Sequence, residues 1–288
     1  MVVGSAIRVP SLSTHQAAAS AEQAAVSAEF DYSIVERTSH RPWPMPRAPW
    51  LMTQSWHDLL FAHWRVDVSE MRRAVPAALT LDLFDDEAWL GTVPFHMTNV
   101  GLRATPTVPW ISAFPELNVR TYVRVADRPG VYFFSLDAAR GLAVAAARAL
   151  LNLPYYLADM TIERRGDGLN YESARCTREH AQFKGTYEPV SAPFAPAIGS
   201  LEYFLTERYC LYHHNRQGHP YRLEIHHRPW SLQIARATIF INTMGAASQV
   251  TLNGVPALLH FARRQDVVAW APTHFFDGHH RSVRNVTE

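Results

Sequence analysis

The chain has 288 residues, of which 48% are hydrophobic, so it is long enough to bury a sizeable core. Its formal net charge of +1 argues against nucleic acid or an anionic membrane as the main partner, and no apolar run approaches the roughly 20 residues that a membrane-spanning helix needs. The two cysteines are too few for a disulfide framework and the N-terminus lacks the pattern of a secretory signal, so we expect a reduced, cytoplasmic protein.

The composition divides the chain into three parts. Residues 1–40 are rich in Ala, Ser and Gln and contain few large apolar side chains, which predicts a flexible N-terminal extension. The stretch "RPWPMPRAPW" then leads into a single domain over residues 41–274, because its prolines favour an extended chain. Residues 275–288 are predicted to form a polar C-terminal tail.

Short strands separated by turn signals dominate this domain. The stretch "TLDLFDDEAWLGTVPF" predicts a hairpin that turns at Asp85 and Asp86. A second hairpin is predicted from "FPELNVRTYVRV" to "GVYFFSLD", and residues 166–168 are expected to form another hairpin turn. Strand-like alternation returns in "YRLEIHHRPWSLQIARATIF" and in "HFARRQDVVAWAP".

Two helices are predicted among these strands. Asp137 is a suitable N-cap for an Ala-rich helix that should end before Pro154, and Ser200 is a suitable N-cap for a helix over residues 201–212. Many strands with a few helices indicate an α+β, β-rich domain that forms one barrel or sandwich.

One predicted strand, residues 114–125, carries a polar face. Its alternating pattern places on that face Glu116, Asn118, Arg120, Tyr122 and Arg124. Such a face is usually solvated, but the partner strand is apolar on both faces and the flanks are rich in aromatic residues, which favours a buried polar face. A buried arginine is well suited to hold a carboxylate.

The usual catalytic motifs are missing. No histidine belongs to an H-E-x-x-H motif, and adjacent histidines on a strand face opposite ways, so the cluster at residues 213–227 predicts no metal site. There is no G-x-S-x-G motif and no Gly-rich phosphate loop, and no cofactor is predicted. Lys184 is the only lysine, so it is the only side-chain amine available for a Schiff base.

Six separated stretches, in chain order, resemble the YqjF-type family, also called DUF2071: "LLFAHW", "ELNVRTYV", "RPGVYFFSLDA", "LPYY", "SLEYFLTERYCLY" and "IHHRPWSLQIA". The resemblance covers roughly residues 48–250 and extends to the acetoacetate decarboxylase-like superfamily, which implies an antiparallel barrel or cone with a few covering helices. In that superfamily a strand glutamate, a hairpin and a helix that ends in a Pro-Lys-Lys segment build a closed pocket. The same order here, with Glu116, the hairpin and then Arg148 and "NLPYY", implies that the polar face points into the barrel.

The sequence departs from that superfamily at the decisive position. Where the decarboxylases carry the Schiff-base lysine and its cationic neighbour, this chain has Tyr155 and Tyr156, and Lys184 lies about thirty residues downstream. Without the amine there is no imine to accept electrons during decarboxylation, so we expect no acetoacetate decarboxylase activity.

Three hypotheses follow for the polar face. In the first, an enzyme without a Schiff base uses Arg120 to hold a carboxylate, Glu116 as general acid or base, and Tyr155 or Tyr156 as a donor to a developing oxyanion. In the second, the same cavity binds a small organic acid without chemistry. In the third, Glu116 and Arg120 form a buried structural ion pair.

The remaining predicted substrate contacts are Asn118, Tyr122, His63 and Arg148. The motifs of the resemblance also contain Glu207, Arg208, His227 and Trp230, for which packing roles are favoured. A small organic acid is the expected ligand. A homodimer is expected because members of the superfamily that the sequence resembles often form oligomers.

Overall fold

The computed structural model describes residues 29–105, 113–139, 141, 153–177, 180–214 and 220–274. In chain order, its elements are η1 (Tyr32–Glu36), β1 (Met52–Val66), α2 (Val68–Ala74), β2 (Thr80–Leu81), β3 (Ala88–Leu102), β4 (Phe114–Val125), β5 (Arg128–Ala138), β6 (Tyr155–Arg165), β7 (Gly168–Arg175), β8 (Gln182–Pro189), α4 (Leu201–Thr206), β9 (Cys210–His214), β10 (Pro220–His227), β11 (Gln233–Asn242), α5 (Met244–Ala247), β12 (Leu258–Ala269) and β13 (Thr273–His274). The prediction of a β-rich α+β domain is confirmed.

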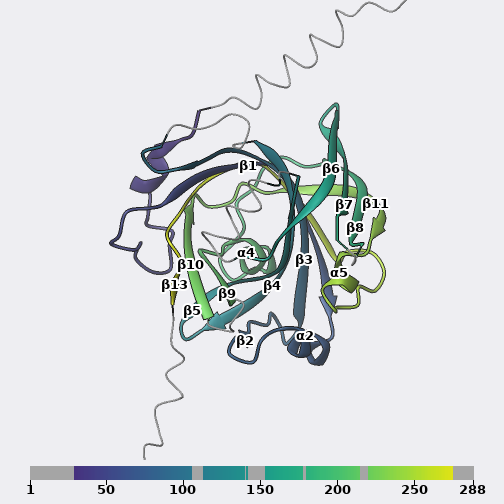
Figure 1. Ribbon diagram of the computed structural model, residues 1–288, viewed down its shortest axis with the longest axis horizontal. Helices are drawn as coiled ribbons and strands as arrows, with labels where there is room; N and C mark the ends of the chain where they lie inside the picture. Colours follow the sequence, from purple (N-terminus) through teal and green to yellow (C-terminus); the bar gives the residue numbers. More distant parts are fainter. Residues whose placement is uncertain are drawn as a thin grey trace, which may run out of the picture.

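The described strands close into a barrel. The order β5-β6-β7-β8-β11-β12-β1-β3-β4 returns to β5, which makes a closed ring of nine strands. A second closure runs through β9 and β10, since β9 pairs with β5 and β10 pairs with β12. It makes a smaller ring of β1, β3, β4, β5, β9, β10 and β12, which we call the inner ring. Figure 1 looks down the inner ring, with α4 across its interior and β6, β7, β8 and β11 to one side.

Strand β4 is the wall between two cores. Residues Glu116 to Tyr122 are buried without exception, so both faces of the strand are covered. Leu117 and Val119 pack on one side into a core that includes Tyr171 of β7. The polar side chains point to the other side, into the inner ring. The predicted two-sided pattern is therefore correct, and the polar face looks inward.

Two of the predicted hairpins are confirmed in full. β4 and β5 pair along their length across a turn at residues 126–127, and β6 and β7 pair across a turn at residues 166–167. The first predicted hairpin is confirmed only at its turn, where Asp85 and Asp86 both have positive φ. β2 pairs with β4 instead of β3, because the backbone N–H of Asp82 donates to Tyr122 of β4.

Both helix predictions need correction. Asp137 is not an N-cap: it lies in β5 and its carboxylate binds Arg175, while most of the Ala-rich stretch after it lies outside the described residues. Ser200 does cap a helix, but α4 ends at Thr206. The rest of the predicted helix becomes β9, because strands β5 and β10 lie on either side of it and supply hydrogen-bonding partners to its backbone.

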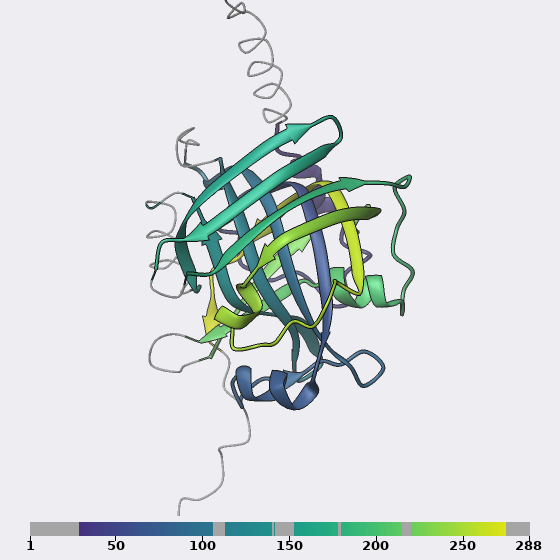
Figure 2. The same cartoon turned by 90° about the vertical axis from the view of Figure 1, so that its right-hand side faces the viewer.

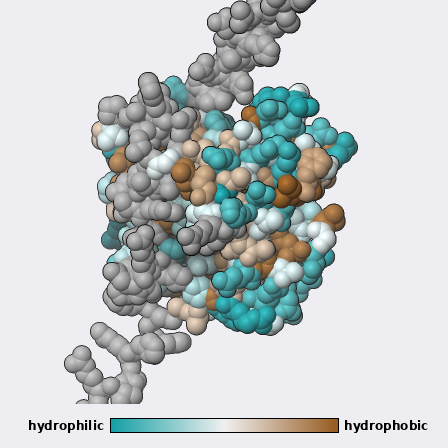
Figure 3. All heavy atoms as spheres, turned by 45° about the vertical axis from the view of Figure 1, so that its right-hand side comes forward, coloured by the Kyte–Doolittle hydropathy of each residue, from teal (hydrophilic) through white to brown (hydrophobic). Residues whose placement is uncertain are grey.

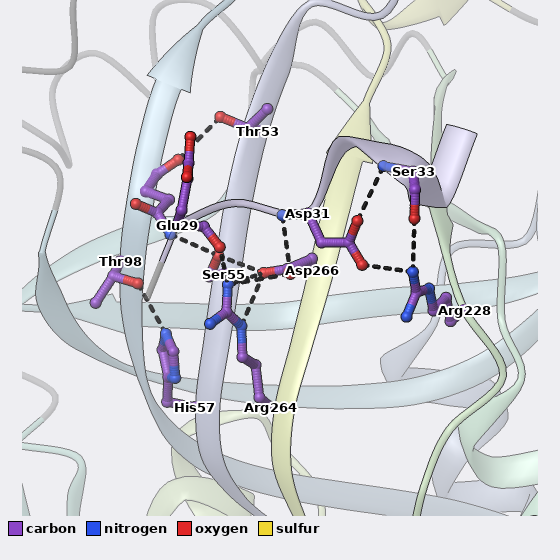
Figure 4. A network of polar contacts seen from close by, with 11 residues as sticks. Glu29, Asp31, Ser33, Thr53, Ser55, His57, Thr98, Arg228, Arg264 and Asp266 are labelled. Atoms are coloured by element: carbon purple, nitrogen blue, oxygen red, sulfur yellow. Dashed lines mark hydrogen bonds and ion pairs between the residues drawn. The ribbon is translucent and has the colours of Figure 1, made fainter. Parts of the chain in front are cut away.

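Residues 29–40, predicted to be part of the extension, pack against the outside of the inner ring. Phe30 and Ile34 are buried against β12. Figure 4 shows the polar contacts of this segment: the Asp31 backbone N–H donates to Asp266, and the Asp31 side chain pairs with Arg228. The packed part of the chain therefore begins before residue 40, while residues 1–28 and 275–288 lie outside the described residues.

The outer surface gives little indication of function. No helix in the described part of the chain is long and apolar enough to cross a bilayer. Figure 2 shows β6, β7, β8 and β11 lying across the front of the molecule, with α2 below them. On this side apolar residues are scattered among hydrophilic ones, as Figure 3 shows, and the exposed apolar side chains of β11 include Ile234 and Phe240.

The ion pair between Asp137 and Arg175 should be essential for stability. Arg175 donates Nε and Nη2 to the two carboxylate oxygens at 3.0 and 2.7 Å, and both side chains are buried. Asp137→Ala leaves the guanidinium buried without its carboxylate, so the free energy of unfolding should fall by about 3–5 kcal/mol in urea titrations. Asp167→Ala, which removes an exposed carboxylate from the β6–β7 turn, should change it by less than about 0.5 kcal/mol. Equal losses would contradict this role.

Candidate functional site

A cavity of about 60 Å³ lies inside the inner ring. A single water needs roughly 10–15 Å³ of such space, so the cavity has room for a few waters or a small organic molecule. Its walls are mostly apolar side chains from β1, β3, β5, β9 and β10. The polar groups that line it include Glu116, Asn118, Arg120, Tyr155, Arg208, His227 and the indole of Trp230.

Glu116 carries a proton at neutral pH. Burial raises the pKa of its carboxyl to about 8; a hydrogen bond from Tyr155 opposes this shift, and the nearby charge of Asp137 adds to it. The Tyr155 hydroxyl donates to Oε2 at 2.9 Å. Oε1 has no hydrogen-bond partner among the described residues, so the protonated carboxyl is able to donate to a molecule in the cavity.

Arg120 is a buried cation without a carboxylate. Its Nη2 donates to the carbonyl oxygen of Leu205 at 3.4 Å, its Nε has no partner, and its guanidinium carbon lies 5.2 Å from the centre of the Phe61 ring. Within the described part of the chain, no acidic side chain pairs with it, Glu116 included. The hypothesis of a structural Glu116–Arg120 ion pair is therefore wrong.

Two further polar groups in the cavity wall lack partners. Asn118 lies between Glu116 and Arg120 on the same face of β4, and its buried Oδ1 accepts no hydrogen bond. The buried indole N–H of Trp230 donates none. Unpaired buried polar atoms cost roughly 1–3 kcal/mol each, so the wall is suited to a ligand or ordered water that supplies both kinds of partner.

His63 and Tyr122 lie beside Arg120 but do not line the cavity. The Tyr122 hydroxyl donates to the carbonyl oxygen of Leu205 at 2.8 Å, and it receives a hydrogen bond from Nε2 of His63 at 2.7 Å. Complete burial holds the pKa of His63 well below its usual value, with the charge of Arg120 as a second cause, so the imidazole is neutral. These two predicted contacts support the end of α4 instead.

The predicted pair of tyrosines separates in the structure. β6 runs parallel to the end of β5 with Leu136 opposite Tyr155 and Asp137 opposite Tyr156, so the two tyrosines face opposite ways. Tyr155 reaches Glu116, whereas the ring of Tyr156 lies 3.9 Å from the guanidinium carbon of Arg175. Arg148 lies outside the described residues.

Lys184 does not line the cavity. It lies on the exposed surface of β8, and its amine pairs with Glu172 of β7 at 2.7 Å. It is therefore not a substitute for a buried Schiff-base lysine. In the described residues, no group of three His, Cys, Asp or Glu side chains is arranged to hold a metal ion.

Sequence reasoning missed Arg208 as part of the cavity wall and Asp82 as its partner. Arg208 follows α4, and its Nη1 donates to the buried Asp82 carboxylate at 2.6 Å. His227 and Trp230 come from the end of β10 and the turn after it. No spacing rule connects these positions. Arg208, His227 and Trp230 were singled out only because they belong to the resembling stretches, and Asp82 belongs to none of them.

Comparisons with known proteins agree with the fold. The model of the family DUF2071, described as an uncharacterized conserved protein, matches residues 53–266. The uncharacterized protein YqjF of Bacillus subtilis (strain 168) is 47% identical over 237 residues, which cover 82% of this chain and 98% of YqjF.

Two solved structures share the architecture at low identity. The enduracididine biosynthesis enzyme MppR, complexed with pyruvate, matches with a TM-score of 0.56 and 11% identity over 82% of this chain and 93% of MppR. An acetoacetate decarboxylase matches with a TM-score of 0.56 and 14% identity over 87% of this chain and 100% of that chain. The predicted acetoacetate decarboxylase-like fold is confirmed.

The raised pKa of Glu116 predicts a specific pH dependence of stability. The folded-state pKa of about 8 lies above the ordinary value of 4.5, so the folded state favours the protonated carboxyl of Glu116. The free energy of unfolding is therefore highest below about pH 4.5 and falls as the pH rises through 8. Glu116→Gln cannot ionise, so its free energy of unfolding should improve relative to the wild type by up to about 1.4 kcal/mol per pH unit across this window.

Urea titrations at several pH values measure this difference. Glu163→Gln, which changes an exposed glutamate of β6, is the matched control and should leave the pH profile unchanged. A constant offset between Glu116→Gln and the wild type at all pH values would show that Glu116 ionises normally.

Proposed function

The chain belongs to the DUF2071 family, and from the contents of its inner ring we propose that it is an enzyme that transfers protons on a small organic acid without a Schiff base. The observation that carries this proposal is Arg120, a guanidinium that is 9% exposed and has no carboxylate partner in the described residues. Leaving such a cation buried is costly, and a carboxylate ligand would compensate it.

Arg120 would hold the carboxylate of the acid. Its Nε has no hydrogen-bond partner in the described residues, and its Nη2 has only a long contact of 3.4 Å to Leu205, so these two donors would serve a bidentate contact. Asn118 lies beside it with an unpaired amide and would accept a hydrogen bond from a hydroxyl or enol group of the ligand. The apolar walls would take the carbon chain.

Glu116 would be the general acid and base. A pKa near 8 is close to working pH, which is the condition for efficient proton transfer in both directions. In its ionised form the carboxylate would take a proton from the carbon next to the carbonyl group of the acid. The carboxyl so formed would return this proton to carbon, or donate it to the oxygen on which negative charge develops. Tyr155 would orient this group through its hydrogen bond to Oε2, a role different from the oxyanion donor first expected.

The choice of reactions also follows from the lack of a lysine amine in the described wall of the cavity. The chain has one lysine, and its amine is exposed and paired with Glu172, so charge must be stabilised on oxygen by Arg120 and Glu116. Enolisation, hydration, dehydration and cyclisation would need only this, whereas decarboxylation through an imine is not expected. The pyruvate complex of MppR supports a small oxo acid as the ligand class.

The second candidate is a binding domain on the same barrel. The small cavity and its unpaired polar groups would also suit a protein that binds an acid without transforming it. Glu116 would then act only as a hydrogen-bond donor. The two candidates differ in whether Glu116 changes its protonation state during the event.

Removal of the Arg120 charge should abolish ligand binding. Arg120→Met keeps the aliphatic stem but loses the guanidinium, so stabilisation by millimolar pyruvate in a thermal shift assay should disappear. Arg236→Met, at an exposed arginine of β11, should respond to pyruvate like the wild type. Undiminished stabilisation of Arg120→Met by pyruvate would count against the proposal.

Isotope exchange separates an enzyme from a binding domain. In heavy water, the wild type should speed exchange of the methyl protons of pyruvate, as followed by NMR, and Glu116→Gln should lose at least about a hundredfold of that rate while still binding pyruvate. Equal exchange rates with and without the protein, alongside binding, would favour the binding domain. Covalent capture of pyruvate by borohydride would overturn a route without a Schiff base.

A further inference from the structure

Asp82 is a buried carboxylate that does not line the cavity but pairs with Arg208, which does. It follows β2, and its backbone N–H donates to the carbonyl oxygen of Tyr122 in β4. Its Oδ2 accepts from Arg208 at 2.6 Å, and its Oδ1 accepts from Arg124 at 3.0 Å. One carboxylate therefore serves two arginines, of which Arg208 is buried and Arg124 is about half exposed.

Arg208 brings a second guanidinium into the wall of the cavity. Its Nε donates to the carbonyl oxygen of Phe204 at 2.6 Å, and its guanidinium carbon lies 4.2 Å from the Phe204 ring and 5.1 Å from the Tyr122 ring. These contacts fix the cation next to Asp82, so the two charges cancel within the wall.

The charges around the cavity can be counted from these contacts. Arg120 contributes one positive charge with no counter-ion in the described residues, and the Arg208–Asp82 pair contributes none. Arg124 also pairs with Asp82, but it is about half exposed and does not line the cavity, so solvent screens its charge. Burial raises the pKa of Glu116 to about 8 and lowers that of His227 to about 4, so both are neutral at pH 7. The described part of the cavity wall therefore presents one uncompensated positive charge.

We propose that Asp82 determines the charge selectivity of the cavity: by neutralising Arg208 it leaves Arg120 as the single free cation among the described residues of the cavity wall, so the site takes a singly charged acid and rejects a dicarboxylate. This inference rests on the proposed function, because it assumes that a carboxylate binds Arg120. A dicarboxylate would bury a second negative charge without a partner, which is strongly unfavourable in a low-dielectric interior.

Two three-carbon acids test this selectivity. Pyruvate carries one carboxylate and malonate carries two, so isothermal titration calorimetry at pH 7 compares ligands of similar size and different charge. The wild type should bind pyruvate at least about thirtyfold more tightly than malonate. Asp82→Asn keeps the shape of the side chain but frees the charge of Arg208, so the preference should shift toward malonate by at least about tenfold.

Arg124→Met is the matched control. It removes the half-exposed partner of the same carboxylate and leaves the Arg208–Asp82 pair intact, so its preference for pyruvate should equal that of the wild type. If Asp82→Asn does not fold, Arg208→Met tests the Arg208–Asp82 pair from its other side, by removing the cation instead of the carboxylate. It leaves the Asp82 carboxylate without its buried partner, and pyruvate affinity should fall at least about tenfold.

The outcomes separate this inference from the proposed function. Absence of binding by the wild type to either acid overturns both. Equal affinity of the wild type for pyruvate and malonate, with binding lost in Arg120→Met, overturns only the role of Asp82. The role of Asp82 is also overturned if a folded Asp82→Asn variant keeps the preference for pyruvate, or if Arg208→Met keeps the wild-type affinity for pyruvate.

Discussion

The structure depends on a stretch of strand β4, from Glu116 to Tyr122, that has no solvent-facing side. This stretch separates two cores, so its polar side chains cannot reach bulk water. Each polar group on it must find a partner inside the inner ring. Tyr122 and Glu116 do so, through Leu205 and Tyr155. Arg120 and Asn118 largely do not, and the small cavity lies where their partners are missing.

This arrangement is costly for folding alone. Unpaired buried polar groups cost roughly 1–3 kcal/mol each and a buried charge costs more, while a folded protein has only about 5–15 kcal/mol of net stability. A second guanidinium in the same wall, Arg208, is fully compensated by Asp82, so burying arginine does not by itself require a vacant partner. The contrast between Arg208 and Arg120 is the reason to assign a ligand to one and not to the other.

The period of two was enough to predict which β4 side chains share a face, and the resemblance predicted that this face is interior. The partners of those side chains depended on register and on long-range contacts. Tyr155 rather than Tyr156 meets Glu116 because β5 and β6 pair in parallel with Leu136 opposite Tyr155. Asp82 and Arg208 are 126 residues apart, and Arg208 was hidden in a stretch whose helical pattern gives way to β9 once β5 and β10 pair with it.

The neighbour of Glu116 determines what this glutamate is able to do, and here that neighbour is Tyr155. A lysine beside Glu116 would favour the ionised carboxylate, whereas the tyrosine hydroxyl offers one neutral hydrogen bond that does not offset burial, so the carboxyl keeps its proton. The interior then holds a proton donor and a cation instead of a nucleophile. Under the proposed function, the site stabilises an enolate through its oxygen, while the ionised form of Glu116 takes the proton from carbon and the protonated form returns it, so acid–base chemistry on a small acid would need no covalent intermediate.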